Sequence, residues 1–328
     1  MQHIHSIYAF FIALTFSALA SCSDGEQPDD VTSKDSPVSF AAIDKQPDAK
    51  ASQTESSAAS ATDYFQADDA LGVFAYYNGS ATPDFMNNQK IVYNGTQWTY
   101  APLKYWPKAG KMDFYGYYPH DAAYKNFTIT QENGRPTLSY SNTDFNYDLM
   151  VADKVELDCA EAKTVTLNFR HLLAKITFTF TFTNSDNTVV YEPVIHMVEF
   201  GNMPYSGTFH YDFATDGTPQ WASINTTATA PVKRRTTDPN GVVIANGKKQ
   251  ITDFDTYLFP GSTMSGEFKV SINNKIYTYT LPQESEFTVG MGKKYNLNFN
   301  ITNNKAGNFF IATFSMWEQG DDVTGKLQ

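Results

Sequence analysis

Positive charge and cysteine are both scarce in this sequence. Lys and Arg together number 24 against 35 Asp and Glu, which gives a formal net charge of −11. No stripe of basic residues alternates with the aromatic ones, so the charge pattern argues against a nucleic-acid partner. The two cysteines, Cys22 and Cys159, lie in different sequence contexts, and we do not expect them to pair. A single internal cysteine such as Cys159 is most often a small buried residue.

Sequence motifs for catalysis and metal binding are missing as well. The histidines beyond the N-terminal stretch show no pair at the spacing of a helical zinc motif; they are His120, His171, His196 and His210. No Gly-x-Ser-x-Gly nucleophile elbow occurs. The stretch from Gly290 to Lys294 looks like a phosphate-binding loop, but Phe287 stands where that loop needs its first glycine. We therefore expect no enzyme activity, no cofactor and no metal.

Aromatic residues, in contrast, are abundant. They make up 15% of the 328 residues, a length that suits about two domains. Ile176, Phe178, Phe180 and Phe182 alternate with threonines, which predicts a strand with one buried face and one face in water. Asn94-Gly95, between residues 90–93 and 98–100, is a strong hairpin signal. Short strands separated by Gly, Asn and Pro turns predict an all-β sandwich.

Three further stretches carry specific expectations. Residues 98–119 alternate apolar and polar positions around Pro107 and Gly110, and we interpret them as a strand, a turn and a strand that form a hairpin in the core. Residues 217–250 resemble a loop excursion with little core. His171, in the strand-like run that begins at Val165, is predicted to be a structural, hydrogen-bonded histidine.

The first 22 residues are predicted to be a lipoprotein signal peptide. Residues 7–20 are apolar but too short to span a bilayer comfortably. They end in Leu19-Ala20-Ser21-Cys22, which resembles a lipobox, the motif whose cysteine is acylated. The leader has His3 and His5 but no Lys or Arg near its start. A plain secretory peptide with a chance cysteine is therefore the alternative.

Residues 23–60 are rich in Ser, Asp, Ala, Gln and Pro and poor in bulky apolar residues, which predicts a flexible acidic linker. Its first residues resemble the acidic export tag of surface lipoproteins, although an ordinary linker would look similar. One island, residues 37–43, has Val38, Phe40 and Ala42 at alternate positions and predicts a short strand. A strand isolated between flexible segments must pair with a distant part of the chain.

Four features together resemble the fimbrillin family, the subunits of type-V pili and their relatives. They are the Leu19–Cys22 lipobox, Trp106-Pro107 with the strand 114–119, the stretch Phe169–Ile176, and a final strand that ends in Trp317. The resemblance implies two tandem transthyretin-like β-sandwiches, which we place at residues 61–160 and 161–328. It also implies a lipid anchor at Cys22, an outer-membrane, surface-exposed location, and a place in the fimbrium after processing.

In stalk subunits of that family, an arginine-specific protease cuts after the first strand, and a C-terminal strand of the next subunit fills the groove. Here no arginine precedes Arg135, so Lys45 and Lys50 are the candidate cleavage sites. Val38, Phe40 and Ala42 would line the detachable strand. An incoming strand would present one alternating face, and the best donor candidates are Phe310, Ala312, Phe314 and Met316. Both segments could equally be permanent strands of the monomer.

The resemblance favours a non-enzymatic pilus subunit or accessory tip adhesin. Its partners would be other pilus subunits, the outer membrane through the lipid anchor, and host or bacterial surface ligands. The stalk, tip and anchor roles stay open. The alternative is a glycan-binding surface lipoprotein of the outer membrane, which would need exposed Tyr or Trp platforms.

Overall fold

The structure is a computed structural model that describes residues 33–44, 65–120, 127–184, 192–214, 217–245, 247–303 and 309–319. For residues 33–35 and 309–319 it describes the backbone alone. The described residues form strands joined by turns and three 3-10 turns, which confirms the predicted all-β class; these turns are η2 (Cys159–Glu161), η3 (Thr252–Phe254) and η4 (Gln283–Ser285). Among these residues, no helix has the length and apolar character needed to cross a bilayer.

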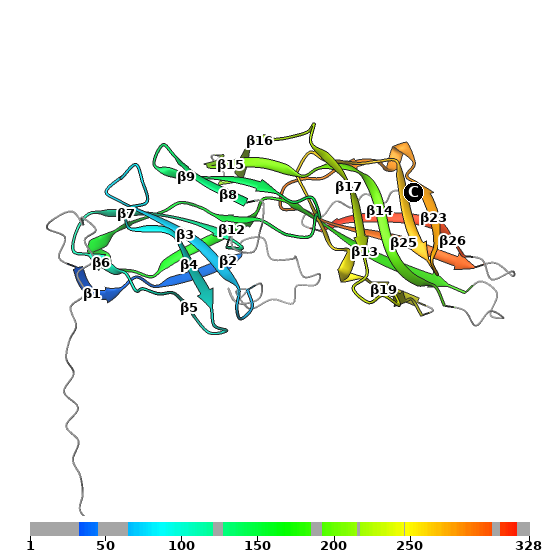
Figure 1. Ribbon diagram of the computed structural model, residues 1–328, viewed down its shortest axis with the longest axis horizontal. Helices are drawn as coiled ribbons and strands as arrows, with labels where there is room; N and C mark the ends of the chain where they lie inside the picture. The colour runs from blue at the N-terminus through cyan, green and yellow to red at the C-terminus, as the bar shows by residue number, and fades with distance from the viewer. Residues whose placement is uncertain are drawn as a thin grey trace, which may run out of the picture.

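Two lobes follow each other along the long axis of the molecule (Figure 1). The first lobe is built on an eight-stranded sheet with the order β2-β12-β10-β7-β3-β4-β5, in which β11 also pairs with β7. Its strands are β2 (Phe40–Asp44), β3 (Ala70–Tyr77), β4 (Met86–Tyr93), β5 (Trp98–Thr99), β7 (Lys111–Tyr118), β10 (Met150–Ala152), β11 (Val155–Asp158) and β12 (Val165–His171). A separate two-stranded sheet joins β1 (Ser33–Pro37) to β6 (Tyr105–Pro107).

Strand β7 lies in the middle of the eight-stranded sheet because both of its faces are apolar. Phe114 packs in the core on one side of the sheet, and Tyr117 packs in the core on the other side. The predicted hairpin across residues 98–119 is therefore wrong. The strand β7 pairs with β3, β10 and β11, whereas β6 pairs with β1 and β5 pairs with β4. The β4–β5 pair confirms the hairpin expected around Asn94-Gly95.

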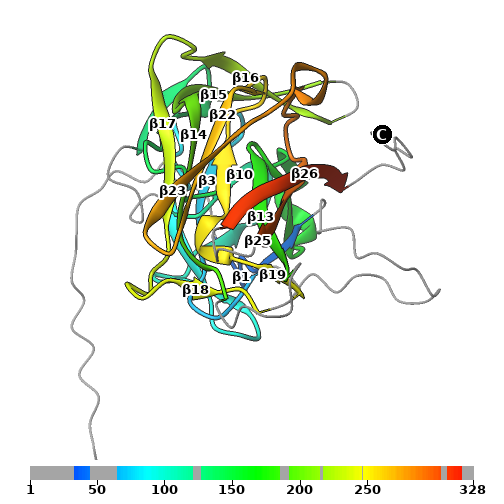
Figure 2. The ribbon, with the colours of Figure 1, turned by 90° about the vertical axis from the view of Figure 1, so that its right-hand side faces the viewer.

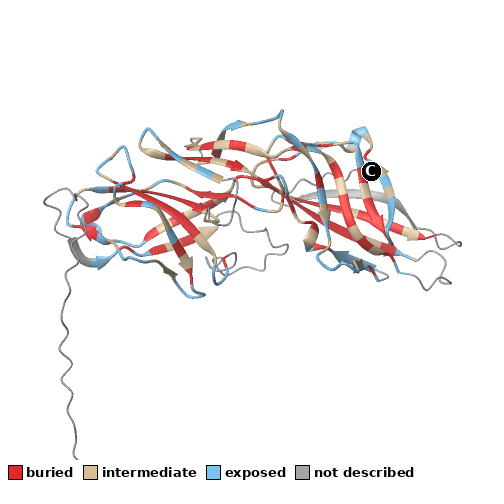
Figure 3. Ribbon diagram, viewed as in Figure 1, coloured by how far each residue is buried: buried red, intermediate tan, exposed pale blue. Residues whose placement is uncertain are grey.

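The eight-stranded sheet curls around its own core, so that its two edges approach each other. β2 is one end of the strand order and β5 is the other. Tyr100, the residue after β5, donates its hydroxyl hydrogen to the carbonyl oxygen of Val38 at 2.8 Å. Figure 3 shows the buried residues concentrated along the middle of these strands. β2 and the preceding Val38 thus close the first core.

A four-stranded sheet covers the opposite face of this sheet. Its order is β16-β15-β9-β8, formed by β8 (Phe127–Glu132), β9 (Arg135–Ser141), β15 (Ser206–Phe213) and β16 (Pro219–Ile224). Aromatic side chains fill the space between the two sheets, among them Phe74, Tyr117, Tyr140 and Phe209. Because β8 and β9 precede β12 while β15 and β16 follow it, this layer links early and late parts of the chain.

The second lobe is a sandwich of two five-stranded sheets around a separate core (Figure 2). One sheet holds β13 (Ala174–Thr183), β19 (Gly247–Gln250), β20 (Thr256–Leu258), β25 (Lys294–Asn303) and β26 (Phe309–Gln319). The other holds β14 (Val194–Pro204), β17 (Thr229–Arg235), β18 (Val242–Val243), β22 (Glu267–Ile272) and β23 (Lys275–Thr280). A short pair, β21 (Thr263–Met264) and β24 (Phe287–Thr288), lies beside them.

Two sequence expectations for the second lobe need correction. The threonine face of β13 does not meet water throughout, because Thr177 and Thr179 are buried and both donate to the side-chain oxygen of Asn296, at 3.0 and 2.9 Å. Residues 217–250 are not a loop excursion, because they include β16 to β19. Val232 of β17 is completely buried. The polar edge strands in this region carry too few apolar residues to be recognised by alternation.

The predicted domain boundary between residues 160 and 161 stays a prediction. The strand that follows it, β12, pairs with β10 and β2 inside the eight-stranded sheet of the first lobe. The chain enters the second lobe only with β13, which pairs with β25.

Candidate strand-docking site

The segment of residues 33–44 lies against the first lobe as a strand that is distant in sequence from its neighbours. β1 runs antiparallel to β6, with Pro37 opposite Tyr105. β2 runs parallel to β12, from Phe40 opposite Val165 to Asp44 opposite Phe169. Within the described residues, β12 is the one strand that β2 pairs with. The segment is therefore held at a sheet edge.

Backbone hydrogen bonds fix the register where β1 passes into β2. The amide of Val38 donates to the carbonyl oxygen of Lys104 at 2.8 Å, and the amide of Val165 donates to the carbonyl oxygen of Ser39 at 2.8 Å. These bonds attach the segment to both sides of the gap that it fills. If it left, the backbone groups on both sides would lose their partners, which is costly where water cannot replace them.

The inward side chains of the segment belong to the first core. Val38, Phe40 and Ala42 are 2%, 7% and 3% exposed. The Phe40 ring makes edge-to-face contacts with Tyr100 and Phe114, at centroid distances of 5.7 and 5.9 Å. Burial of a Val or Phe side chain stabilises by about 1.5–3 kcal/mol. The alternation of residues 38, 40 and 42 therefore matches a face that fits the core, as expected from the sequence.

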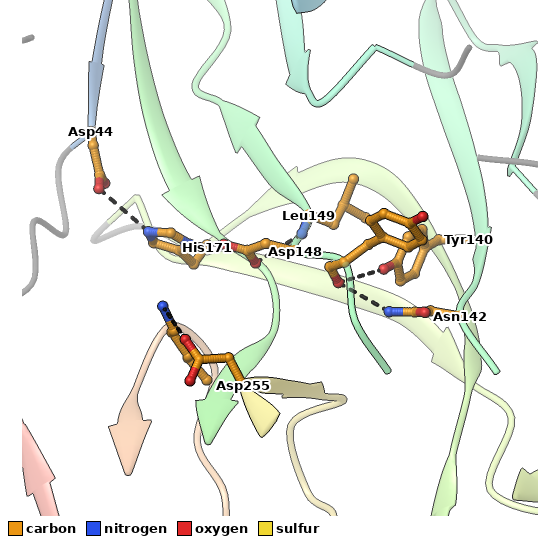
Figure 4. A network of polar contacts seen from close by, with 9 residues as sticks. Asp44, Tyr140, Asn142, Asp148, Leu149, His171 and Asp255 are labelled. Carbon is orange, nitrogen blue, oxygen red and sulfur yellow. Dashed lines mark hydrogen bonds and ion pairs between the residues drawn. The ribbon is translucent and has the colours of Figure 1, made fainter. Parts of the chain in front are cut away.

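A buried ionic network fastens the far end of β2 (Figure 4). His171, the last residue of β12, has its Nδ1 2.5 Å from a carboxylate oxygen of Asp148 and its Nε2 3.4 Å from a carboxylate oxygen of Asp44. The Asp44 and Asp148 side chains are only 5% and 6% exposed. The other oxygen of Asp148 accepts the amide hydrogen of Leu149 at 2.8 Å. His171 is thus hydrogen-bonded at the end of its strand.

The charges of this network determine the protonation of His171. Burial alone lowers the pKa of His171, but the carboxylate of Asp148 and then that of Asp44 outweigh it, and the pKa rises from 6.5 to about 10. At neutral pH the imidazole is therefore a cation, with an N–H for each carboxylate. A buried charge is tolerated only when it is paired. His171 and Asp148 form one part of this ionic network, and Asp44 at the end of β2 completes it.

The C-terminal strand β26 lies at the edge of a sheet in the second lobe. It pairs antiparallel with β25 from Phe309 opposite Asn303 to Gln319 opposite Lys294, with a register shift at Ala312, between the pairs Ile311–Ile301 and Thr313–Asn300. The predicted donor residues Phe310, Ala312, Phe314 and Met316 all lie on this strand, for which the backbone alone is described. The structure thus places the two predicted exchange segments in different lobes, and it does not bring them together.

The remaining predicted site residues lie outside the described residues. They are the lipidation candidate Cys22 and the cleavage candidates Lys45 and Lys50. Cys159 is completely buried. In the described part of the chain, no group of three or more His, Cys, Asp and Glu side chains is arranged to bind a metal ion.

Sequence reasoning missed Asp44 and Asp148 as partners of His171. One signal was available for Asp44. It follows Ala42 by two positions, so alternation places an acidic residue on the same face as Val38, Phe40 and Ala42. A carboxylate that is buried on an apolar strand face needs a cation or a hydrogen-bond donor beside it, so its presence there indicates such a partner. No comparable pattern marks Asp148.

These features define a two-lobed β-sandwich protein in which an N-terminal segment completes the first core. The profile of the family described as fimbrillin-like matches residues 54–317. The chain therefore belongs to the fimbrillin-like family, which confirms the family expected from its sequence.

Similar proteins agree with this assignment. The fimbrium subunit Fim1C of Phocaeicola vulgatus is 27% identical over 143 residues, which are 35% of this chain and only 37% of that protein. A candidate cell-adhesion protein of Bacteroides uniformis is 21% identical, with a TM-score of 0.52 over 86% of this chain and 98% of that one. Another from Bacteroides ovatus is 17% identical, with a TM-score of 0.51 over 88% and 100%. At these identities the two structures show a shared fold.

Proposed function

We propose that this chain is a non-enzymatic subunit or accessory tip adhesin of a cell-surface type-V pilus, assembled by donor-strand exchange. One observation carries the proposal. The segment 33–44 ends in the edge strand β2, yet it buries three apolar side chains, Val38, Phe40 and Ala42, in the first core. Release of such a segment would leave unpaired backbone groups and exposed apolar surface, which a strand from another subunit can cover.

The composition of the flanking segment supports release. Residues 45–64, which connect β2 to the rest of the first lobe in sequence, contain few bulky apolar residues and include Lys45 and Lys50. A protease that cuts there separates residues 33–44 from the rest of the first lobe in sequence, so that hydrogen bonds and packing alone retain them. Removal of the covalent link makes exchange with a second strand possible.

The position of β26 makes it the best donor in this chain. It is the last strand of its sheet order and pairs with β25 alone among the described strands. An edge strand can leave with the loss of one ladder of hydrogen bonds, whereas a central strand loses two. Its sequence also offers apolar residues at alternate positions from Phe310 to Met316.

Limited trypsin digestion of the purified protein tests the assembly. We expect cleavage after Lys45 or Lys50, followed by oligomers that survive SDS without boiling. Deletion of the chain from Asn308 onward should abolish the oligomers and leave a folded first lobe. A Lys45→Gln/Lys50→Gln variant is the matched control, and it should stay monomeric under the same digestion.

Cleaved protein that stays monomeric at high concentration would rule out a donor role for this chain. In that case a tip or membrane-anchored position becomes the better assignment.

We propose that the precursor reaches the outer membrane through acylation of Cys22 and is exposed at the cell surface, with other pilus subunits as its partners.

A specific surface feature supports glycan binding as the second candidate. A hollow of about 520 Å³ lies over the four-stranded sheet, and its lining residues carry no charged side chain; they are Thr128, Ser139, Tyr140, Ser141, Ser206, Gly207, Thr208, Ser223, Ile224 and Asn225. Thr128, Ser139, Thr208 and Ser223 stand opposite one another on four adjacent strands. Neutral hydroxyl groups of this kind can hydrogen-bond the hydroxyls of a saccharide.

A saccharide array with purified protein tests this candidate. Binding that a Ser139→Ala/Thr208→Val variant loses, without a change in thermal stability, would support it. Equal binding by both proteins would exclude the hollow as the site. Trp106 is 1% exposed, so this tryptophan offers no platform for a sugar ring.

A further inference from the structure

The inward face of the N-terminal segment ends in an acid. Val38, Phe40, Ala42 and Asp44 follow one another at intervals of two residues. The first three are buried in the first core, and the Asp44 carboxylate lies 3.4 Å from the His171 Nε2. The segment therefore presents an apolar stretch and then a carboxylate to the groove.

The part of the first lobe that would remain after the segment leaves still holds a buried ion pair. His171 stays with Asp148, which bonds its Nδ1 at 2.5 Å. The second N–H of the imidazole then loses the carboxylate of Asp44. A strand with an apolar residue at this position would bury that N–H beside a hydrocarbon group, without a hydrogen-bond acceptor, which is unfavourable. A strand with a carboxylate would restore the contact.

The C-terminal strand β26 carries the same pattern in its sequence. Ala312, Phe314, Met316 and Glu318 stand at intervals of two residues, and the acid follows the phenylalanine by four positions, as Asp44 follows Phe40. In both segments an aliphatic or small residue comes first, followed at alternate positions by a phenylalanine, an apolar residue and an acidic residue. Met316 is longer than Ala42, but methionine is the apolar side chain that adapts best to an irregular space.

We propose that the groove of the first lobe selects its incoming strand through an acidic residue that pairs with His171, and that Glu318 of a second copy of this chain fills the position of Asp44. The strand would run parallel to β12, with Phe314 at the position of Phe40. This inference rests on the proposed donor-strand function and adds the register and the residue that the groove recognises.

A peptide-displacement experiment tests the inference without changing the protein fold. A specific protease site placed in the segment 51–60 of the full chain allows one cut after β2. The cut protein is then incubated with synthetic peptides of residues 309–319, and release of its N-terminal fragment is followed by gel filtration and mass spectrometry. The peptides are the natural sequence, Glu318→Gln, Glu318→Asp, and the control Ser315→Ala on the opposite face.

We expect the natural, Glu318→Asp and Ser315→Ala peptides to release the fragment, and the Glu318→Gln peptide to need at least tenfold higher concentration. In a His171→Gln protein the difference between the natural and Glu318→Gln peptides should fall to within twofold. Should that protein not fold, the Glu318→Asp peptide still separates a carboxylate effect from a size effect.

Two outcomes would overturn the inference, and they differ from each other. Equal release by the natural and Glu318→Gln peptides would show that strand exchange occurs without recognition of the acid, so the proposed function would stand and this inference would fall. No release by any peptide would remove the donor-strand role and the inference together.

Discussion

The ring of Tyr117 occupies the space in front of Gly72, the residue directly opposite it on the neighbouring strand. A Cβ atom at Gly72 would lie 1.9 Å from Cε1 of Tyr117. The Tyr117 hydroxyl donates to the side-chain oxygen of Asn88 at 2.8 Å, and its ring stacks on Phe74 with a centroid distance of 6.2 Å. The glycine thus allows one large aromatic residue to lie flat across the centre of the sheet.

We expect Gly72→Ala to lower the free energy of unfolding by about 1–3 kcal/mol or more, because the Tyr117 ring must shift and lose these contacts. Chemical denaturation measures this. Gly290→Ala is the matched control, since its nearest neighbour is the flexible Lys293 side chain at 3.1 Å. A similar loss in both variants would contradict the packing explanation.

His171→Ala should lower the free energy of unfolding by about 3–5 kcal/mol, because two buried carboxylates lose their cation. In the same variant, residues 33–44 should become more accessible to proteases. His210→Ala serves as the control, because His210 pairs with Glu132 at 3.2 Å in a more exposed position. The His210→Ala change should lower the free energy of unfolding by about 1 kcal/mol or less. An equal loss of stability in His171→Ala and His210→Ala would show that the buried network stabilises the fold no more than an exposed pair does.

Stability should fall as the pH rises from neutral toward 10.5. The pKa of His171 is about 10 in the folded chain and 6.5 in the unfolded chain. The stabilisation is therefore complete below pH 6.5 and is lost as the pH rises through 10. Urea denaturation at a series of pH values measures the effect. His171→Gln should flatten the curve over this interval, and an unchanged slope in that variant would assign the effect to other groups.

Phe40→Ala should cost about 3–5 kcal/mol, since a buried ring is removed from the first core. Hydrogen exchange should also accelerate at the Val165 amide, which donates to Ser39. Ser39→Ala provides the comparison, because its Oγ makes one exposed contact with Thr164 at 3.0 Å. The loss there should be about 0.5–1.5 kcal/mol at most. Normal protection of β12 in Phe40→Ala would mean that the segment contributes little to closing the core.

Metabolic labelling with a fatty-acid analogue should mark the precursor and should fail to mark Cys22→Ala. The expectation rests on Leu19-Ala20-Ser21-Cys22 behind an apolar stretch. A single acyl chain binds membranes weakly, whereas the several chains of a bacterial lipoprotein bind stably. Cys159→Ala is the control and should label normally, because Cys159 is buried in the folded chain. Labelling of Cys22→Ala at the normal level would exclude this anchor.

The sequence by itself determined the class of fold and the faces of many strands. Alternation of apolar and polar residues is a local property, since side chains of a strand point to opposite sides in turn. This is why the buried face of Val38, Phe40 and Ala42 was visible in the sequence, although the strand expected over residues 37–43 is divided between β1 and β2. The turn signal Asn94-Gly95 correctly predicted a hairpin for the same local reason. Short sequence motifs likewise indicated the family, which the match over residues 54–317 shows.

Only the tertiary structure decided which strands are neighbours. Alternation states which face of a strand is apolar, but backbone hydrogen bonds are the same for every sequence, so the partner depends on how all the apolar faces pack together. The strand β6 therefore pairs with β1 instead of β7, and β2 finds β12 more than a hundred residues away. The contact between Asp44 and His171 depends on that parallel register. Both carboxylates reach one imidazole because three distant segments fold against one another.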